Sequence, residues 1–118
     1  MYIIQGGQTL SGKIKVQGSK NSSLPILAAT IINGKKNVIC DVPRIRDIDV
    51  MCQILSHLGA GITRHDNVIE VDSERANSFE VPEQLMREMR SSIILMGALL
   101  GRYGKAKVSY PGGCEIGP

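Results

Sequence analysis

Apolar residues recur at helical spacing in four segments of the chain. The clearest is 48–58, where they follow one another every three or four positions between Asp47, a predicted N-cap, and Gly59. This pattern is typical of a helix that buries one face and leaves the other in water. The other predicted helices are 24–32, 82–89 and 91–100, the last ending at Gly101 and Gly104.

The helix predicted over 24–32 lies between signals that can start it and stop it. Asn21 or Ser22 can cap its N-terminus, and Pro25 is tolerated within a first turn. Asn33 and Gly34 follow the last apolar residue and favour a stop there.

Short runs with apolar residues at alternate positions predict strands between these helices. They lie at 2–5, 13–16, 37–40, 62–64, 68–71 and 106–110, with a turn at 65–67. Strands that alternate with helices indicate an α/β fold. A glycine-rich loop is expected over 111–118.

A weak internal repeat relates two parts of the chain. A shift of 69 places residues 22–31 over 91–100, and one further residue aligns Gly34 with Gly104. Each unit would be a strand, a buried helix, a strand, an amphipathic helix and a hairpin. Two apolar helices can also resemble each other by chance. Because repeat architectures need about three units, the repeat predicts that this chain is a fragment of one and a half units.

Composition disfavours several classes of function. Aromatic residues make up 3% of the 118, so the core is expected to be aliphatic and nucleic-acid binding by base stacking is disfavoured. The net charge of +3, with 14 basic and 11 acidic residues interspersed, suits a small anionic substrate better than a polyanion. No apolar run approaches the roughly 18 residues of a membrane span, and no signal peptide is recognisable. We therefore expect neither a nucleic-acid partner nor a membrane partner.

The three cysteines, Cys40, Cys52 and Cys114, are not spaced as disulfide or zinc motifs. No metal is therefore expected, and the compartment is expected to be reducing, hence cytoplasmic. Cys40 and Cys52 lie in apolar surroundings and are expected to be core residues. Cys114 follows two glycines in a loop, where nearby cations would lower its pKa and make it reactive, although an inert cysteine in a turn fits the same pattern.

Two cationic residues occupy equivalent places in the repeat. Lys20, followed by Asn21, and Arg90 each lie just before a buried apolar helix. If the units pack about a pseudo-symmetry axis, the helix N-termini converge and their N–H groups favour an anion there. Lys20 and Arg90 would add full positive charge, although solvated side chains at loop edges fit the same spacing.

Three motifs together resemble one enzyme family. Segments 18–25, 89–92 and 111–117 resemble the bacterial UDP-N-acetylglucosamine 1-carboxyvinyltransferases, enolpyruvyl transferases that begin peptidoglycan synthesis, and 41–48 and 58–60 also fit. The resemblance implies an inside-out α/β barrel built from βαβαββ units, incomplete in this chain. Residues 1–20 would be strands of the other domain of the full-length enzyme. Residues 21–118 would be the first one and a half units of the catalytic domain, ending in the catalytic loop.

The resemblance also implies a reaction and roles for four residues. The enolpyruvyl group of phosphoenolpyruvate would be transferred to the 3-hydroxyl of UDP-N-acetylglucosamine, with release of phosphate and without a cofactor. Lys20 and Asn21 would hold phosphoenolpyruvate, and Arg90 would bind the nucleotide sugar. Cys114 would be the loop cysteine that donates a proton and that fosfomycin alkylates. The family is roughly three and a half times longer, so this chain alone is expected to be inactive without the remainder of the full-length chain.

Three alternatives stay open from the sequence. One is another enolpyruvyl transferase, such as the shikimate-pathway enzyme, which the Cys114 loop disfavours. Another is a non-catalytic nucleotide-sugar-binding or assembly module that needs a second chain. A redox or regulatory thiol protein would depend on Cys114 alone.

Overall fold

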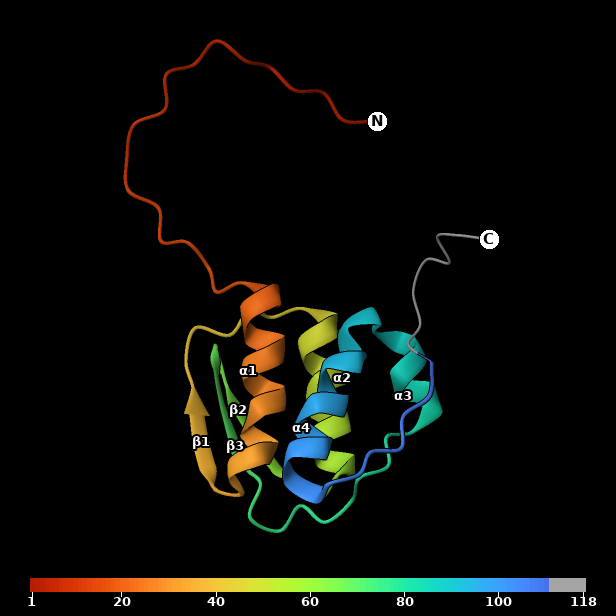
Figure 1. Cartoon of the computed structure of the whole chain (residues 1–118). Helices are drawn as coiled ribbons and strands as arrows, with labels where there is room; N and C mark the ends of the chain where they lie inside the picture. Colours follow the sequence, from red (N-terminus) through yellow and green to blue (C-terminus); the bar gives the residue numbers. More distant parts are fainter. Residues whose placement is uncertain (111–118) are drawn as a thin grey trace.

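The computed structural model describes residues 1–110, and they form a small sheet with helices packed against one face (Figure 1). The strands are β1 (Lys36–Ile39), β2 (Gly61–His65) and β3 (Val68–Asp72), in the order β1-β3-β2 with β3 antiparallel to both neighbours. The helices are α1 (Lys20–Asn33), α2 (Arg46–His57), α3 (Glu83–Glu88), the 3-10 turn η1 (Arg90–Ile93) and α4 (Ile94–Tyr103). The α/β class is therefore confirmed.

The centre of the fold is aliphatic, as the composition predicts. Leu27 and Ile31 of α1, Ile54 of α2, Ile69 of β3 and Leu95 of α4 are fully buried. Alternation along β3 places Ile69 and Val71 on the buried face of the sheet, where the helices cover them. One continuous apolar core therefore joins the sheet to the helices that come before and after it.

The helix starts differ from the predicted caps. Ser19 occupies the N-cap position of α1, so neither Asn21 nor Ser22 does, and the hydroxyl of Ser22 instead donates to the carbonyl of Ser19 at 3.1 Å. Pro25 lies in the second turn rather than the first. Asp47 likewise lies inside the first turn of α2, which begins after Ile45. Extended backbone at these cap positions, rather than a side-chain hydrogen bond, sets where both helices begin.

Two strands predicted near the N-terminus are not formed among the described residues. Residues 2–5 and 13–16 carry no strand pairing, and Ile3, Ile4 and Ile14 are at least 84% exposed. Alternating apolar residues favour extended chain, but a strand also needs a neighbour for its N–H and C=O groups. Residues 1–110 offer these segments no such neighbour.

The segment 106–110 is also not a strand. Lys107 makes one parallel bridge with Glu80, and its amide donates to the carbonyl of Phe79 at 2.9 Å. The carbonyl of Lys107 accepts from the amide of Val81 at 3.0 Å. This pairing holds the chain after α4 against the segment that precedes α3.

The helix predicted over 82–89 ends one residue early, and the next begins with a tighter turn. Met89 is extended, with φ of −141°, and separates α3 from η1, which leads directly into α4. Gly101 lies within α4 and does not break it. Gly104 ends the helix in the left-handed conformation, with φ of 67°.

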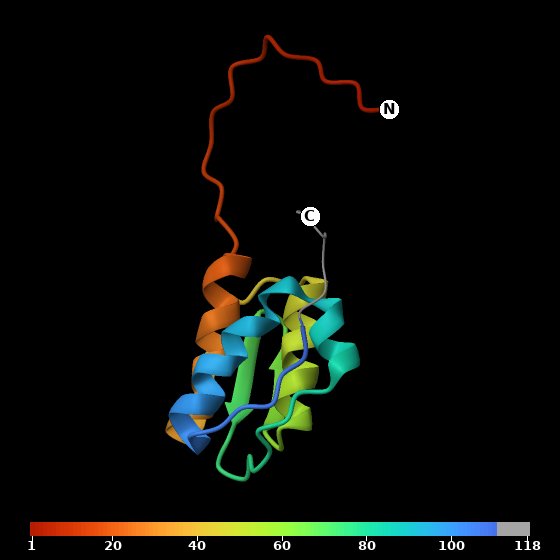
Figure 2. The ribbon, with the colours of Figure 1, turned by 45° about the vertical axis from the view of Figure 1, so that its right-hand side comes forward.

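The two helices related by the repeat are equivalent in the structure. Gly34 ends α1 with φ of 62°, and its repeat partner Gly104 ends α4 in the same conformation. The two helices lie side by side and run in the same direction (Figures 1 and 2). Their N-termini are therefore at the same end of the fold, as the repeat predicts.

Candidate functional site

Helix N-termini gather at one end of the molecule. The helices α1, α2 and the η1–α4 segment all begin there (Figure 1), and side chains link the start of α2 to the start of α1 and to the end of α3. The first N–H groups of a helix have no intrahelical partner and carry partial positive charge. This end, called the N-terminal platform below, comprises Lys20, Asn21, Asp47 and Arg90.

Lys20 is the first residue of α1 rather than a residue before it, and its side chain is paired. Its ammonium donates to a carboxylate oxygen of Asp47, in the first turn of α2, at 2.8 Å. The two side chains are 46% and 29% exposed, so the pair faces solvent from one side. An ammonium has three N–H donors, and this contact uses one of them.

Arg90 is the first residue of η1 and is exposed. Within residues 1–110 its guanidinium has no ion-pair partner, and Asn21 makes no side-chain hydrogen bond in the same part of the chain. The backbone beside Arg90 is held by Ser92, a buried residue whose hydroxyl contacts the carbonyls of Met86 at 3.1 Å and Met89 at 2.7 Å. Arg90 therefore projects from a fixed turn.

A second ion pair lies beside the platform, at the same end of the fold. Arg46, the first residue of α2, contacts Glu88, the last residue of α3, at 3.2 Å. Sequence reasoning assigned no role to Arg46, Glu88 or Ser92, and it treated Asp47 only as a cap. Their sequence signal was their position inside the motif segments or directly beside them, near the ends of predicted helices.

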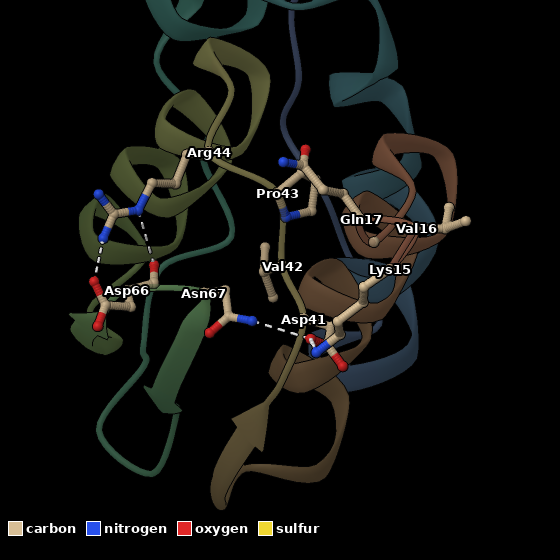
Figure 3. Close-up of a pocket in the computed structure, with 10 residues that line it drawn as sticks. Lys15, Val16, Gln17, Asp41, Val42, Pro43, Arg44, Asp66 and Asn67 are labelled. Carbon is tan, nitrogen blue, oxygen red and sulfur yellow. Dashed lines mark hydrogen bonds and ion pairs between the residues drawn. The ribbon is translucent and has the colours of Figure 1, made fainter. Parts of the chain in front are cut away.

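A groove of about 420 Å³ lies beside the platform, between the approach to α1 and the β2–β3 turn (Figure 3). It was not predicted. Its walls are joined by polar contacts: Asn67 donates to Asp41 at 3.0 Å, and Arg44 pairs with Asp66 at 2.6 Å. Asp41 and Asp66 both have positive φ, of 56° and 51°. The groove residues are Lys15, Val16, Gln17, Gly18, Asp41, Val42, Pro43, Arg44, Asp66 and Asn67.

The structure shows the surroundings of two of the three cysteines. Cys52 packs against the core, and burial raises the pKa of its thiol, which makes it less reactive. Cys40 is exposed, so the expectation that it is a core residue is wrong: it directly follows β1, and the alternation of that strand puts it with the exposed residues Lys36 and Val38. Cys114 lies outside the described residues.

Among residues 1–110, no group of three or more His, Cys, Asp or Glu side chains is placed to hold a metal ion. No helix within that part is long and apolar enough to cross a membrane.

The fold and the platform define an α/β repeat unit whose cationic side chains stand at helix N-termini. Comparison with known proteins identifies the family. Residues 4–118 match the family model described as EPSP synthase (3-phosphoshikimate 1-carboxyvinyltransferase). The chain belongs to this family of enolpyruvyl transferases.

The names of similar curated proteins are more specific than that of the family model. A protein of Caldanaerobacter subterraneus named UDP-N-acetylglucosamine 1-carboxyvinyltransferase 2 is 51% identical over 98% of this chain, and a UDP-N-acetylglucosamine 1-carboxyvinyltransferase of Saccharophagus degradans is 47% identical over the same share. This chain spans 28% of the length of each. Among solved structures, the enolpyruvyl transferase NikO of Streptomyces tendae matches 86% of this chain and 24% of its own, with 28% identity and a TM-score of 0.72. These matches confirm the resemblance and the enolpyruvyl transferase fold predicted from the motifs.

Proposed function

We propose that this chain is the N-terminal part of a UDP-N-acetylglucosamine 1-carboxyvinyltransferase. The enzyme would transfer the enolpyruvyl group of phosphoenolpyruvate to the 3-hydroxyl of UDP-N-acetylglucosamine and release phosphate, in the cytoplasm. The observation that carries the proposal is the 51% identity, across almost the whole chain, to a relative of that name. The position of Lys20 and Arg90 at helix N-termini supports it independently.

The platform suits chemistry on an anionic substrate. Phosphoenolpyruvate carries a phosphate and a carboxylate, and negative charge develops on the phosphate as it leaves in the elimination step. Lys20 has N–H donors left after pairing with Asp47, and Asn21 beside it supplies both a donor and an acceptor. Preorganised donors at helix N-termini stabilise such charge without reorganising during the reaction. We assign phosphoenolpyruvate to Lys20 and Asn21.

Arg90 is assigned to the nucleotide sugar. Its guanidinium is exposed and projects from the turn that Ser92 fixes, so it can pair with a diphosphate without moving the backbone. Cys114 is assigned as the proton donor, on the glycine-rich loop expected over 111–118. Residues 104–110, which follow α4, run back towards the platform (Figures 1 and 2), and this direction supports the assignment. A thiol must be protonated to donate, so we expect its protonation state to depend on closure of the site.

Further polypeptide is required to complete the fold. Ile26 and Ile32 of α1 and Met96 and Leu100 of α4 are between 40% and 51% exposed, although they belong to helices that otherwise form the core. An exposed apolar face of this kind favours coverage by another element. We assign that role to the remainder of the longer protein to which the relatives correspond.

A chimera tests the proposed function directly. Residues 1–118 would replace the matching segment of the Caldanaerobacter relative, and phosphate release would be measured with both substrates. We expect release that depends on UDP-N-acetylglucosamine and turnover that approaches the relative's own. A chimera that folds and binds the nucleotide sugar but releases no phosphate would instead favour a non-catalytic binding module.

Alkylation by fosfomycin tests the Cys114 assignment on the chain itself. Intact mass and peptide mapping would follow labelling with and without UDP-N-acetylglucosamine, with Cys114→Ser as the control. We expect one adduct on Cys114 that forms faster with the nucleotide sugar. Equal labelling of all three cysteines would contradict a working half-site.

A further inference from the structure

We propose that Asp47 is a positioning residue for Lys20, holding its ammonium where the anionic substrate arrives. This inference depends on the proposed function, because only there is Lys20 assigned to phosphoenolpyruvate. Nothing in the sequence patterns pointed to this role, since Asp47 was expected only to cap a helix.

The geometry joins two helix starts through one contact. Lys20 begins α1 and Asp47 lies in the first turn of α2, with 2.8 Å between ammonium and carboxylate. The positive end of α2 favours a carboxylate in that turn, so Asp47 itself is held in place. The contact uses one donor of the ammonium and leaves two for a ligand on the solvent-facing side.

A held lysine is needed because the side chain is otherwise flexible. Lysine carries a compact charge on a stem with four rotatable bonds, and ordering it at the moment of binding opposes affinity. The α1 helix also opposes a cation at its own N-terminus. Asp47 offsets that repulsion and fixes the charge before the substrate arrives.

The neighbouring pair Arg46–Glu88 supplies a matched control. It connects the same end of the fold at 3.2 Å, and the Glu88 side chain is 31% exposed, against 29% for Asp47. Asp47→Asn and Glu88→Gln each remove one carboxylate of similar exposure at this end of the fold. They differ in that only Asp47 contacts Lys20.

The test compares these variants in the chimera. We expect Asp47→Asn to lower kcat/KM for phosphoenolpyruvate by about 10- to 100-fold, the range found for outer-shell partners of metal ligands. The KM for UDP-N-acetylglucosamine and the midpoint of thermal unfolding should stay near those of the parent, and Asp47→Glu should recover part of the loss. Glu88→Gln should change kcat/KM by no more than about twofold, as exposed ion pairs usually do.

A second readout does not depend on turnover. The acetylation rate of Lys20, followed by mass spectrometry, should rise in Asp47→Asn and stay constant in Glu88→Gln. Equal losses of activity in both variants, or an increase in Asp47→Asn, would overturn the positioning role even in an active chimera. An inactive parent chimera would contradict the proposed function instead, while the labelling rates would still report whether Asp47 holds Lys20.

Discussion

The two ends of the helix layer use their cations in opposite ways. Where α4 ends, Arg102 donates to the carbonyl of Ile31 at 2.7 Å and to that of Ala76 at 3.0 Å. Where the helices begin, Lys20 pairs with one carboxylate and Arg90 projects from its turn. At the first end, backbone carbonyls accept the hydrogen bonds of the cation. At the second end, side-chain N–H donors face solvent.

Helix polarity explains what this difference means. A helix C-terminus exposes carbonyl groups, so a cation there is satisfied by the fold itself. A helix N-terminus exposes N–H groups and repels a cation, so a lysine or arginine there gains nothing from the backbone. Such residues require an anion, which is Asp47 for Lys20 and, in our proposal, the substrates for both cations. A cation at a helix N-terminus, which the dipole opposes, therefore indicates a functional role. A cation at a helix C-terminus, which the dipole favours, indicates a role in stability.

The largest expected effect comes from removing the cation that opposes its helix. In the chimera, Lys20→Met should lower kcat/KM for phosphoenolpyruvate by about 10²- to 10³-fold, since it removes a donor aimed at developing charge. Lys35→Met, an exposed lysine near the opposite end, is the control and should be close to the parent. Phosphate release measures kcat/KM. A loss of less than threefold in Lys20→Met would mean that the cation at the helix N-terminus does not act on the substrate.

The second-largest expected effect is a loss of stability at the end of the fold where α4 finishes. Arg102→Met should destabilise the chain by about 2 kcal/mol, because the part-buried carbonyl of Ile31 loses its donor, while that of Ala76 keeps Tyr103 at 2.7 Å. Urea unfolding of the 118-residue chain measures this difference.

Arg87→Met is the comparison for that measurement. It removes an exposed pair with Glu83 one turn away and should cost about 0.5 kcal/mol or less. Equal losses in the two variants would contradict the view that Arg102 stabilises the fold through the backbone.

The sequence predicted features set by local spacing and missed those set by distant partners. Helix α2 and the β2–β3 hairpin follow from apolar periodicity, and the repeat correctly paired Gly34 with Gly104. The segments 2–5 and 13–16 have strand-like alternation, but pairing depends on a neighbour that no local pattern reveals. The contact of Lys20 with Asp47 spans 27 positions and was invisible for the same reason.

Sequence motifs predicted which residues belong to the candidate site, but they did not predict the contacts that these residues make. Spacing placed Lys20 and Arg90 just before buried helices, whereas the structure has them as the first residues of α1 and η1. The resemblance alone gave them substrates. The burial of Ser92 and its contacts with two carbonyls depend on the turn between α3 and α4, where an extended Met89 interrupts the expected helix. Cys40 was wrongly predicted to be buried, because apolar neighbours in sequence do not show which face of the sheet a residue at the end of a strand lies on.

A smaller effect distinguishes the two glycines near the end of α4. Gly104→Ala should destabilise the chain by about 1 kcal/mol, since φ of 67° is unfavourable for alanine although nothing lies within 4 Å of the added carbon. Gly101→Ala lies within the helix with only Ile32 at 4.0 Å, and should stabilise by about 0.5 kcal/mol. Thermal unfolding of both variants would show opposite signs. The same sign in both would mean that Gly104 does not end the helix in solution.

The smallest expected effect belongs to an exposed ion pair on the sheet. Lys36 and Glu70 lie 2.7 Å apart on neighbouring strands, and their hydrogen bond lowers the pKa of Glu70 and raises that of Lys36. The stabilisation is therefore complete between the two ordinary pKa values. It is lost as pH falls through the lowered pKa of Glu70, and also as pH rises through the raised pKa of Lys36. Glu70→Gln should lower the unfolding temperature only slightly at pH 7 and flatten its dependence on pH between about 5 and 3. A loss at pH 7 as large as that in Arg102→Met would mean that exposed ion pairs, and not contacts with helix ends, dominate the electrostatics of this fold.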